Sequence, residues 1–194
     1  PALPRSPALL AELAAAARDA AAPLRASLFG ADAEQRAAES FKSARPFPHI
    51  VLRDLIVDSE SREEAARDET DVAAAAAAGT AGSGASEKEP LPSLLLRAVR
   101  DEILEHVTAT YKETDLFRVF QTGDLANIDG LPREEREAKL PALSALRAAL
   151  SSERFVSLVE RVTGCGALSP GRVDLSCNVY APRGHLLSHD DVIG

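Results

Sequence analysis

The chain has 194 residues, which is enough for one domain with a buried core. It has no run near the ~18 consecutive apolar residues of a membrane span, and its two cysteines are too few for a disulfide framework. We therefore expect a protein of a reducing compartment, cytoplasmic, nuclear or both, without a membrane segment. Of the net charge of −8, −6 falls between Asp58 and Pro90, and this acidity argues against direct binding of nucleic acid through a basic face.

The start of the chain predicts a leading helix. Residues 7–29 are Ala-rich and carry a short apolar stripe, which predicts a helix interrupted at Pro23. We expect residues 1–40 to form a peripheral leading segment. An organelle-targeting peptide is the alternative, but Glu12 and Asp19 count against it because such peptides avoid acidic residues.

The main domain is expected over residues 41–194, with one insertion. Pro46 and Pro48 exclude a helix, and residues 49–52 predict the start of a strand. Residues 58–90 are first acidic, then Ala-rich, then rich in Gly and Ser. Such a segment cannot bury enough apolar surface to offset its chain entropy, so we predict a disordered insertion within one domain.

The middle of the chain predicts three helices and a short strand. An amphipathic helix is predicted over residues 92–107, because apolar residues recur there at helical spacing, namely Leu95, Val99, Ile103 and Val107. Residues 116–120 are an apolar and aromatic strand candidate. Further helices are predicted over residues 134–150 and 152–162, and Gly164 ends the last one.

The clearest alternation in the chain lies over residues 173–180. One face carries Val173, Leu175, Cys177 and Val179, and the other carries Asp174, Ser176, Asn178 and Tyr180. This pattern predicts a half-buried strand, and a polar inner face is typical of a cavity that lines a site. Residues 182–184 break the strand, and a second strand is predicted after them. The predicted order is therefore helices first and sheet later.

The second predicted strand carries His189 and Asp191 in an H-x-D arrangement. In an extended strand, residues two apart point to the same face, so one imidazole and one carboxylate converge. They are two of the three ligands of the two-His-one-carboxylate triad that binds non-haem Fe(II). The chain stops three residues later, so we interpret it as the N-terminal part of a longer protein that supplies the third ligand. The missing initial Met agrees with that interpretation.

Two other interpretations of these residues were weighed. H-x-D also arises by chance, in which case the two Asp residues at positions 190 and 191 belong to a solvated loop end. His185 and His189 would share a face on a helix, as in zinc-binding H-x-x-x-H pairs. Pro182 and Gly184 disfavour that helix, and in a strand the two histidines lie about 13 Å apart, too far to share one ion.

With its motifs in view, the chain resembles the Fe(II)- and 2-oxoglutarate-dependent oxygenases, specifically the ribosomal prolyl 3-hydroxylase branch of the prolyl 4-hydroxylase-like family. Four stretches carry the resemblance in order, namely ARPFPHIVLRDLI (44–56), TDLFRVFQTGDL (114–125), LPALSALRAALSSERFVSLVERVTG (140–164) and VDLSCNVYAPRGHLLSHDD (173–191). The resemblance implies an α+β fold, a partial double-stranded β-helix (jelly-roll-like) with flanking helices that is truncated after its first core strands.

The resemblance also implies the site and its chemistry. His189 and Asp191 match the proximal Fe(II) ligands, and Tyr180 matches the strand tyrosine that hydrogen-bonds the cosubstrate carboxylate. The distal His and the basic residue that pairs with 2-oxoglutarate are expected beyond Gly194. The implied reaction hydroxylates a proline of a small-subunit ribosomal protein, coupled to oxidative decarboxylation of 2-oxoglutarate by Fe(II) and O2, with ascorbate keeping the iron reduced.

Because one ligand is missing, we expect this chain alone to be inactive. The alternatives are a non-catalytic binding module on the same fold, a related oxygenase with another substrate, and a helical interaction protein in which H-x-D is accidental.

Overall fold

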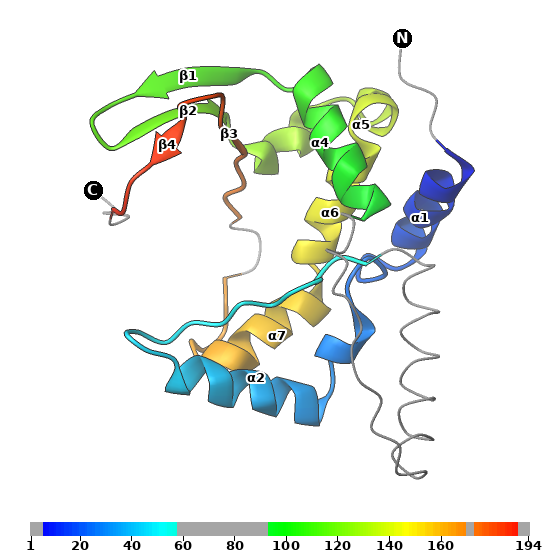
Figure 1. Cartoon of the computed structure of the whole chain (residues 1–194). Helices are drawn as coiled ribbons and strands as arrows, with labels where there is room; N and C mark the ends of the chain where they lie inside the picture. The colour runs from blue at the N-terminus through cyan, green and yellow to red at the C-terminus, as the bar shows by residue number, and fades with distance from the viewer. Residues whose placement is uncertain (1–5, 58–92, 170–172, 190–194) are drawn as a thin grey trace, which may run out of the picture.

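The computed structural model describes residues 6–57, 93–169 and 173–189 (Figure 1). Its helices are α1 (Pro7–Arg18), η1 (Ala26–Leu28), α2 (Ala31–Ser43), α4 (Leu94–His106), η2 (Leu125–Gly130), α5 (Arg133–Lys139), α6 (Pro141–Leu150) and α7 (Glu153–Thr163). Its strands are β1 (Ala109–Glu113), β2 (Phe117–Thr122), β3 (Asn178–Val179) and β4 (His185–Leu186). The predicted insertion at 58–90 and the predicted ligand Asp191 lie outside the described residues.

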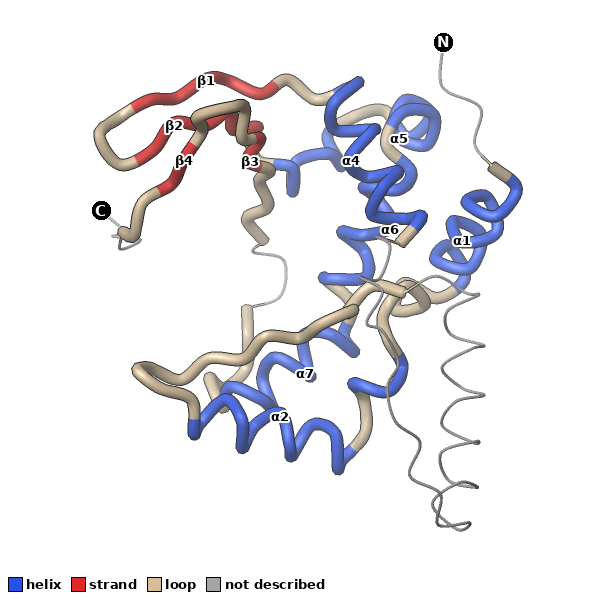
Figure 2. The backbone as a smooth tube through the Cα atoms, in the orientation of Figure 1, coloured by secondary structure: helices blue, strands red, loops and turns tan. Residues whose placement is uncertain are grey.

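Helices and one antiparallel sheet together make an α+β arrangement, as predicted. Figure 2 shows the sheet at one end of the molecule, α2 and α7 at the other, and α6 between them. The finer prediction of a double-stranded β-helix stays a prediction. In the described ranges, no helix is both long and apolar enough to cross a membrane.

The sheet is built around β2. One edge of β2 pairs with β1 in an antiparallel hairpin, in which Tyr111 lies opposite Phe120. Its other edge pairs with β3 near Phe120 and with β4 near Arg118, both antiparallel. β3 and β4 are therefore two parts of one ribbon that runs along the same edge of β2.

Between its two parts, this ribbon leaves the sheet as a wide bulge. Phe120 pairs with Val179 and Arg118 pairs with His185, so five residues, 180–184, lie opposite Val119 alone. The bulge closes as a β-turn in which the Gly184 N–H donates to the Ala181 carbonyl at 2.7 Å. Pro at the second turn position and a positive φ of 71° at the third, Arg183, are the features of a type II turn.

The helices bury one main apolar cluster between them. It consists of Leu95, Val99, Ile103, Leu125, Ile128, Leu140, Ala142 and Leu143, with Leu13, Leu175 and Cys177 among the side chains packed against it. A second cluster joins Ala21, Leu24 and Ala149, with Phe29, Leu55, Ile56 and Phe155 around it. The main cluster thus links the helices to the ribbon that carries the predicted site residues.

Local sequence explains where most helices begin and end. The hydroxyl of Ser93 accepts a hydrogen bond from the Leu96 N–H at 3.2 Å and caps α4, and Ser152 caps α7 in the same way. Gly164 ends α7 in the left-handed conformation, with φ 69°. The predicted helices over 92–107 and 152–162 are therefore confirmed, within one or two residues.

The N-terminal region differs from its prediction. The helix predicted over 7–29 ends at Arg18, well before Pro23, because Asp19 is extended and its side chain accepts from the Ala21 N–H at 2.9 Å. Residues 49–52 form a loop instead of a strand; the pairing here is a single bridge between Leu24 and Ile56.

The predicted leading segment is not separate from the rest. Leu13 of α1 packs against the main cluster, Leu24 is almost fully buried in the second, and α2 runs across the predicted boundary at residue 40. Side chains from the described part of this segment, residues 6–40, therefore contribute to the same apolar interior as the helices that follow. The boundary between the two predicted parts stays a prediction.

Two predictions for the middle of the chain were also wrong. The helix predicted over 134–150 is two helices, α5 and α6, separated at Leu140. The sheet does not follow the helices, because β1 and β2 lie between α4 and α5 in the chain. β1 was not predicted. Four of its five residues are exposed, so neither face of the strand needs to be apolar, and the sequence lacks the alternation that marks a half-buried strand.

Candidate functional site

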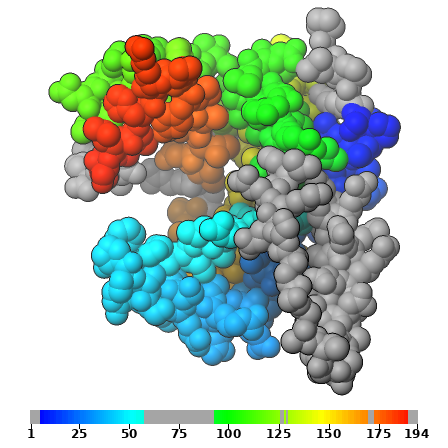
Figure 3. All heavy atoms as spheres, viewed as in Figure 1, coloured from blue at the N-terminus to red at the C-terminus, as the bar shows by residue number. Residues whose placement is uncertain are grey.

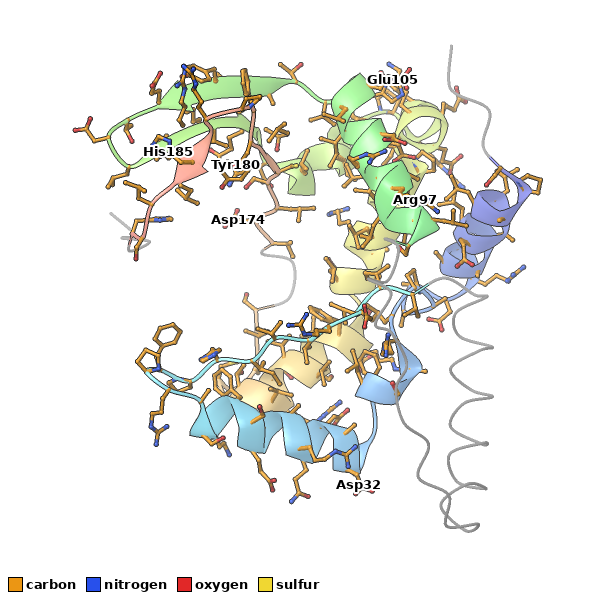
Figure 4. The ribbon with its side chains drawn as sticks, in the orientation of Figure 1. Asp32, Arg97, Glu105, Asp174, Tyr180 and His185 are labelled. Atoms are coloured by element: carbon orange, nitrogen blue, oxygen red, sulfur yellow. The ribbon has the colours of Figure 1, made fainter. Side chains whose placement is uncertain are left out.

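The predicted site residues lie along the ribbon beside β2. Tyr180 directly follows β3, His185 lies in β4, and His189 comes three residues after β4 ends. Figure 4 labels Asp174, Tyr180 and His185 on this ribbon. Asp191 lies outside the described residues, so the structure does not test whether it meets His189.

The alternation predicted over 173–180 is largely present. Leu175, Cys177 and Val179 are half-buried, whereas the four polar residues between and beside them are exposed. Val173 departs from the pattern, because its side chain is 43% exposed. Tyr180 therefore lies on the polar face of the ribbon, as predicted, and that face is exposed; the prediction that it lines a cavity stays a prediction.

Hydrogen bonds hold this part of the ribbon extended although β3 itself spans two residues. The Thr122 N–H donates to the Cys177 carbonyl at 3.0 Å, and the Cys177 N–H donates to the Thr122 hydroxyl at 3.0 Å. The Leu125 N–H donates to the Leu175 carbonyl at 2.6 Å. The ribbon is thus anchored to the end of β2 before it reaches Tyr180.

His189 is exposed and its ring is oriented by its own backbone. Its Nδ1 lies 2.8 Å from the Leu187 carbonyl oxygen. Because a carbonyl oxygen can only accept, this contact is a hydrogen bond when Nδ1 carries the proton, and a neutral ring in that tautomer binds a metal through Nε2. Backbone carbonyls commonly orient metal-binding histidines in this way.

The strand that was expected to carry His189 is shorter than predicted. β4 ends at Leu186, and one further backbone bond, from the Leu187 N–H to the Leu116 carbonyl at 2.8 Å, continues the pairing. The chain bends at Ser188, so strand alternation does not carry over to His189. The alternative in which His185 and His189 share a helix is wrong, because His185 lies in a strand.

The two predicted ligands, His189 and Asp191, are of a type that fits Fe(II). An imidazole nitrogen and a carboxylate oxygen are ligands that suit Fe(II) and leave positions open for further ligands. Within residues 6–57, 93–169 and 173–189, no three His, Cys, Asp or Glu side chains lie close enough together to bind a metal ion. Of the predicted ligands, His189 is the one whose surroundings are known.

A polar cluster on the neighbouring hairpin was not predicted. The Tyr111 hydroxyl donates to Glu113 and accepts from the Arg118 Nε at 2.9 Å. The hydrogen bond to Glu113 raises the pKa of Tyr111, and the bond to Tyr111 raises the pKa of Arg118. Arg118 is the register partner of His185, so this cluster borders β4. In the sequence, this cluster could have been found from Tyr111 and Glu113, which are two residues apart and therefore share one face of a strand.

The surface near the ribbon is hollowed. Figure 3 shows a recess between the loop after α2, in cyan, and the ribbon over residues 173–189, in orange and red. The loop exposes two large apolar side chains, with Phe47 64% and Val51 73% exposed. Of the predicted site residues, Tyr180 and His189 are therefore on an open part of the molecule.

The sequence was compared with families and with curated proteins. No family model matches the chain. Over 99 residues, 51% of this chain, the sequence is 50% identical to prolyl 3,4-dihydroxylase OGFOD1 of Ostreococcus tauri.

About half of the chain is similar to a prolyl hydroxylase. The match covers 19% of that relative's length, so the chain spans about a fifth of it. This similarity supports the predicted likeness to the prolyl hydroxylase family and indicates a hydroxylase.

Proposed function

We propose that this chain is the N-terminal part of a prolyl hydroxylase that acts on a small-subunit ribosomal protein and consumes 2-oxoglutarate and O2. The observation that carries the proposal is the 50% identity over 99 residues to a prolyl 3,4-dihydroxylase. The H-x-D motif after β4 and the open polar face of the ribbon support it. The low cysteine content supports a cytoplasmic or nuclear location.

Each site residue has a defined role in this proposal. His189 and Asp191 bind Fe(II), and the exposed hydroxyl of Tyr180 donates a hydrogen bond to a carboxylate of 2-oxoglutarate. The bound metal supplies open coordination positions for oxygen chemistry, and ascorbate keeps it reduced. The distal His and a basic partner for 2-oxoglutarate come from residues after Gly194.

The remainder of the described chain orients these groups. The Leu187 carbonyl fixes the His189 ring and its tautomer, and the bonds to Thr122 hold the ribbon that leads to Tyr180. A protein-bound His with a fixed second nitrogen loses less rotational freedom when it binds a metal. The scaffold thus pre-orients the described half of the site.

The proposal is tested in the full-length protein that contains this chain. We expect His189→Ala and Asp191→Ala each to lower succinate formation and peptide hydroxylation by more than about 100-fold, beyond the ~10–100-fold typical of losing an outer-sphere partner. Tyr180→Phe should raise the KM for 2-oxoglutarate by about 10-fold or more, since a hydrogen bond to a charged group contributes ~1.5–3 kcal/mol. Mass spectrometry of a proline-containing ribosomal peptide measures the product.

The matched control is His185→Ala, which removes another exposed imidazole from the same ribbon and should leave turnover unchanged. No succinate from the unaltered protein under any condition would contradict the proposal and favour a non-catalytic binding module. Turnover only with free proline or other prolyl peptides would favour a related oxygenase. Robust succinate formation by the isolated 194-residue chain would contradict the expected need for a further ligand.

A further inference from the structure

The bulge at residues 180–184 is not required by the sheet. Removal of Ala181–Gly184 would place Tyr180 opposite Val119, with Val179 still opposite Phe120 and His185 still opposite Arg118. The ladder along β2 would then be continuous. The chain therefore contains four residues that interrupt an otherwise regular pairing.

The turn inside the bulge uses unfavourable backbone geometry. Arg183 has a φ of 71°, a conformation in which the Cβ of an L-residue crowds the backbone. Glycine or asparagine usually occupies this position of a type II turn. Such geometry persists where the surrounding structure imposes it, and it is concentrated at functional sites.

Gly184 closes the bulge at a point that has no room for a side chain. A Cβ built there would lie 2.9 Å from the Ala181 carbonyl oxygen and 3.1 Å from the Arg118 carbonyl oxygen. Both atoms belong to the backbone, so neither can rotate away. Only glycine lets the ribbon return to β2 immediately after the turn.

Bulges occur next to active sites, where they redirect a side chain or displace the chain that follows. Here the bulge begins with Tyr180, and His189 follows four residues after His185 restores the pairing. We propose that the bulge is a spacer that places His189 relative to Tyr180, and that Gly184 is the positioning residue that holds it. This inference rests on the proposed function, because it assigns Tyr180 to the cosubstrate and His189 to the metal.

The test compares two glycine variants in the full-length protein. Gly184→Ala should lower coupled hydroxylation about 10- to 100-fold, because small misplacements of reacting groups have effects of that size. It should also raise the KM for 2-oxoglutarate and increase the ratio of succinate to hydroxyproline. Gly123→Ala, at the far end of β2, is the matched control, since a Cβ there meets nothing within 4 Å.

Two further variants separate positioning from folding. Deletion of Ala181–Gly184 leaves a continuous ladder and should give a folded protein by circular dichroism, but one that has lost coupled hydroxylation. Arg183→Gly relieves the positive φ without moving the chain and should keep the KM and the coupling ratio of the unaltered protein. If Gly184→Ala yields no folded protein, the deletion variant decides.

The outcomes distinguish this inference from the function on which it rests. No turnover by the unaltered protein would overturn the proposed function and this inference together. Turnover by the unaltered protein, with a KM and coupling ratio in Gly184→Ala equal to those of Gly123→Ala, would overturn the inference alone. A folded deletion variant with normal coupling would do the same.

Discussion

The carboxylate of Glu102 caps a helix to which it does not belong. Helix α6 begins with Pro141 and has no capping side chain of its own. Glu102 of α4 accepts hydrogen bonds from the Ala142 N–H at 3.0 Å and the Leu143 N–H at 2.9 Å. A buried negative charge at a helix N-terminus also interacts favourably with the helix dipole.

We expect Glu102→Gln to lower the free energy of unfolding by about 1–2 kcal/mol, the range of losing a helix cap. The amide keeps one acceptor oxygen but loses the charge and the second acceptor. Urea unfolding followed by circular dichroism measures the change. Glu105→Gln, on the exposed side of the same helix, is the control, and equal midpoints for the two variants would contradict the capping role.

This residue also shows what the sequence could not reveal. Ser152 and Gly164 lie next to the helix that they begin and end, so α7 was predicted within a residue or two. The break at Leu140 has a local cause, because Pro141 lacks the N–H that a continuous helix needs and disfavours a helical conformation at the residue before it. The prediction of one helix over 134–150 was wrong because it did not use this signal. The cap on the new helix was not predictable from a local pattern, because Glu102 lies 40 residues away in the chain from the N–H group of Ala142.

At the scale of elements, α2 and α7 are joined by an ion pair. The Arg161 guanidinium donates two hydrogen bonds to the Glu34 carboxylate. Its Nε lies 2.5 Å from Glu34 Oε2, and a second nitrogen lies 2.8 Å from Oε1. The hydrogen bond from Arg161 lowers the pKa of Glu34 below 4.5. Near that pH the folded state therefore binds fewer protons than the unfolded chain. The ion pair stabilises the fold fully above about pH 4.5, and its contribution to stability decreases as the pH falls below that value.

We therefore expect Glu34→Gln to lower the Tm at pH 7, and the difference from the unaltered chain to narrow in acid. Thermal unfolding measured from pH 7 down to pH 3 tests both parts. Glu39→Gln, another Glu of α2 that is exposed, should have a smaller effect. A difference in Tm that is independent of pH would show that the pair acts through packing rather than charge.

The sheet illustrates which elements were predictable. β2 was predicted from its run of apolar and aromatic residues, of which Val119 is buried, and the break at 182–184 was predicted from Pro and Gly. The return of the ribbon to the same edge of β2 was not, because pairing depends on Arg118, far away in the sequence. For the site, the sequence predicted His189, Asp191 and Tyr180 through motif and resemblance, and their roles stay predictions.

At the scale of the whole molecule, the leading segment contributes buried side chains to the interior. Leu24 is 2% exposed and packs with Ala149 and Phe155 from the region of α6 and α7. Leu10, in α1, is 51% exposed. The leading segment therefore contains one leucine that the fold requires and one that it does not.

We expect Leu24→Ala to lower the free energy of unfolding by about 2–5 kcal/mol, the usual range for a buried leucine. Leu10→Ala should change it by less than about 0.5 kcal/mol, as for an exposed position. Urea titration of the 194-residue chain compares them. Similar midpoints would support the prediction that the leading segment is peripheral.

The bulge has a consequence for aligning this chain with its relatives. It adds an even number of residues to a ribbon whose side chains alternate, so His185 and Leu186 keep the faces they would have in an unbroken strand. If a relative lacks two or four residues between Val179 and His185, the side chains that follow stay on the same faces of the sheet. If it lacks one or three, they move to the opposite faces. Alignments of this chain with similar sequences should therefore accept even gaps here, and an odd gap would identify a sequence whose ribbon follows a different path.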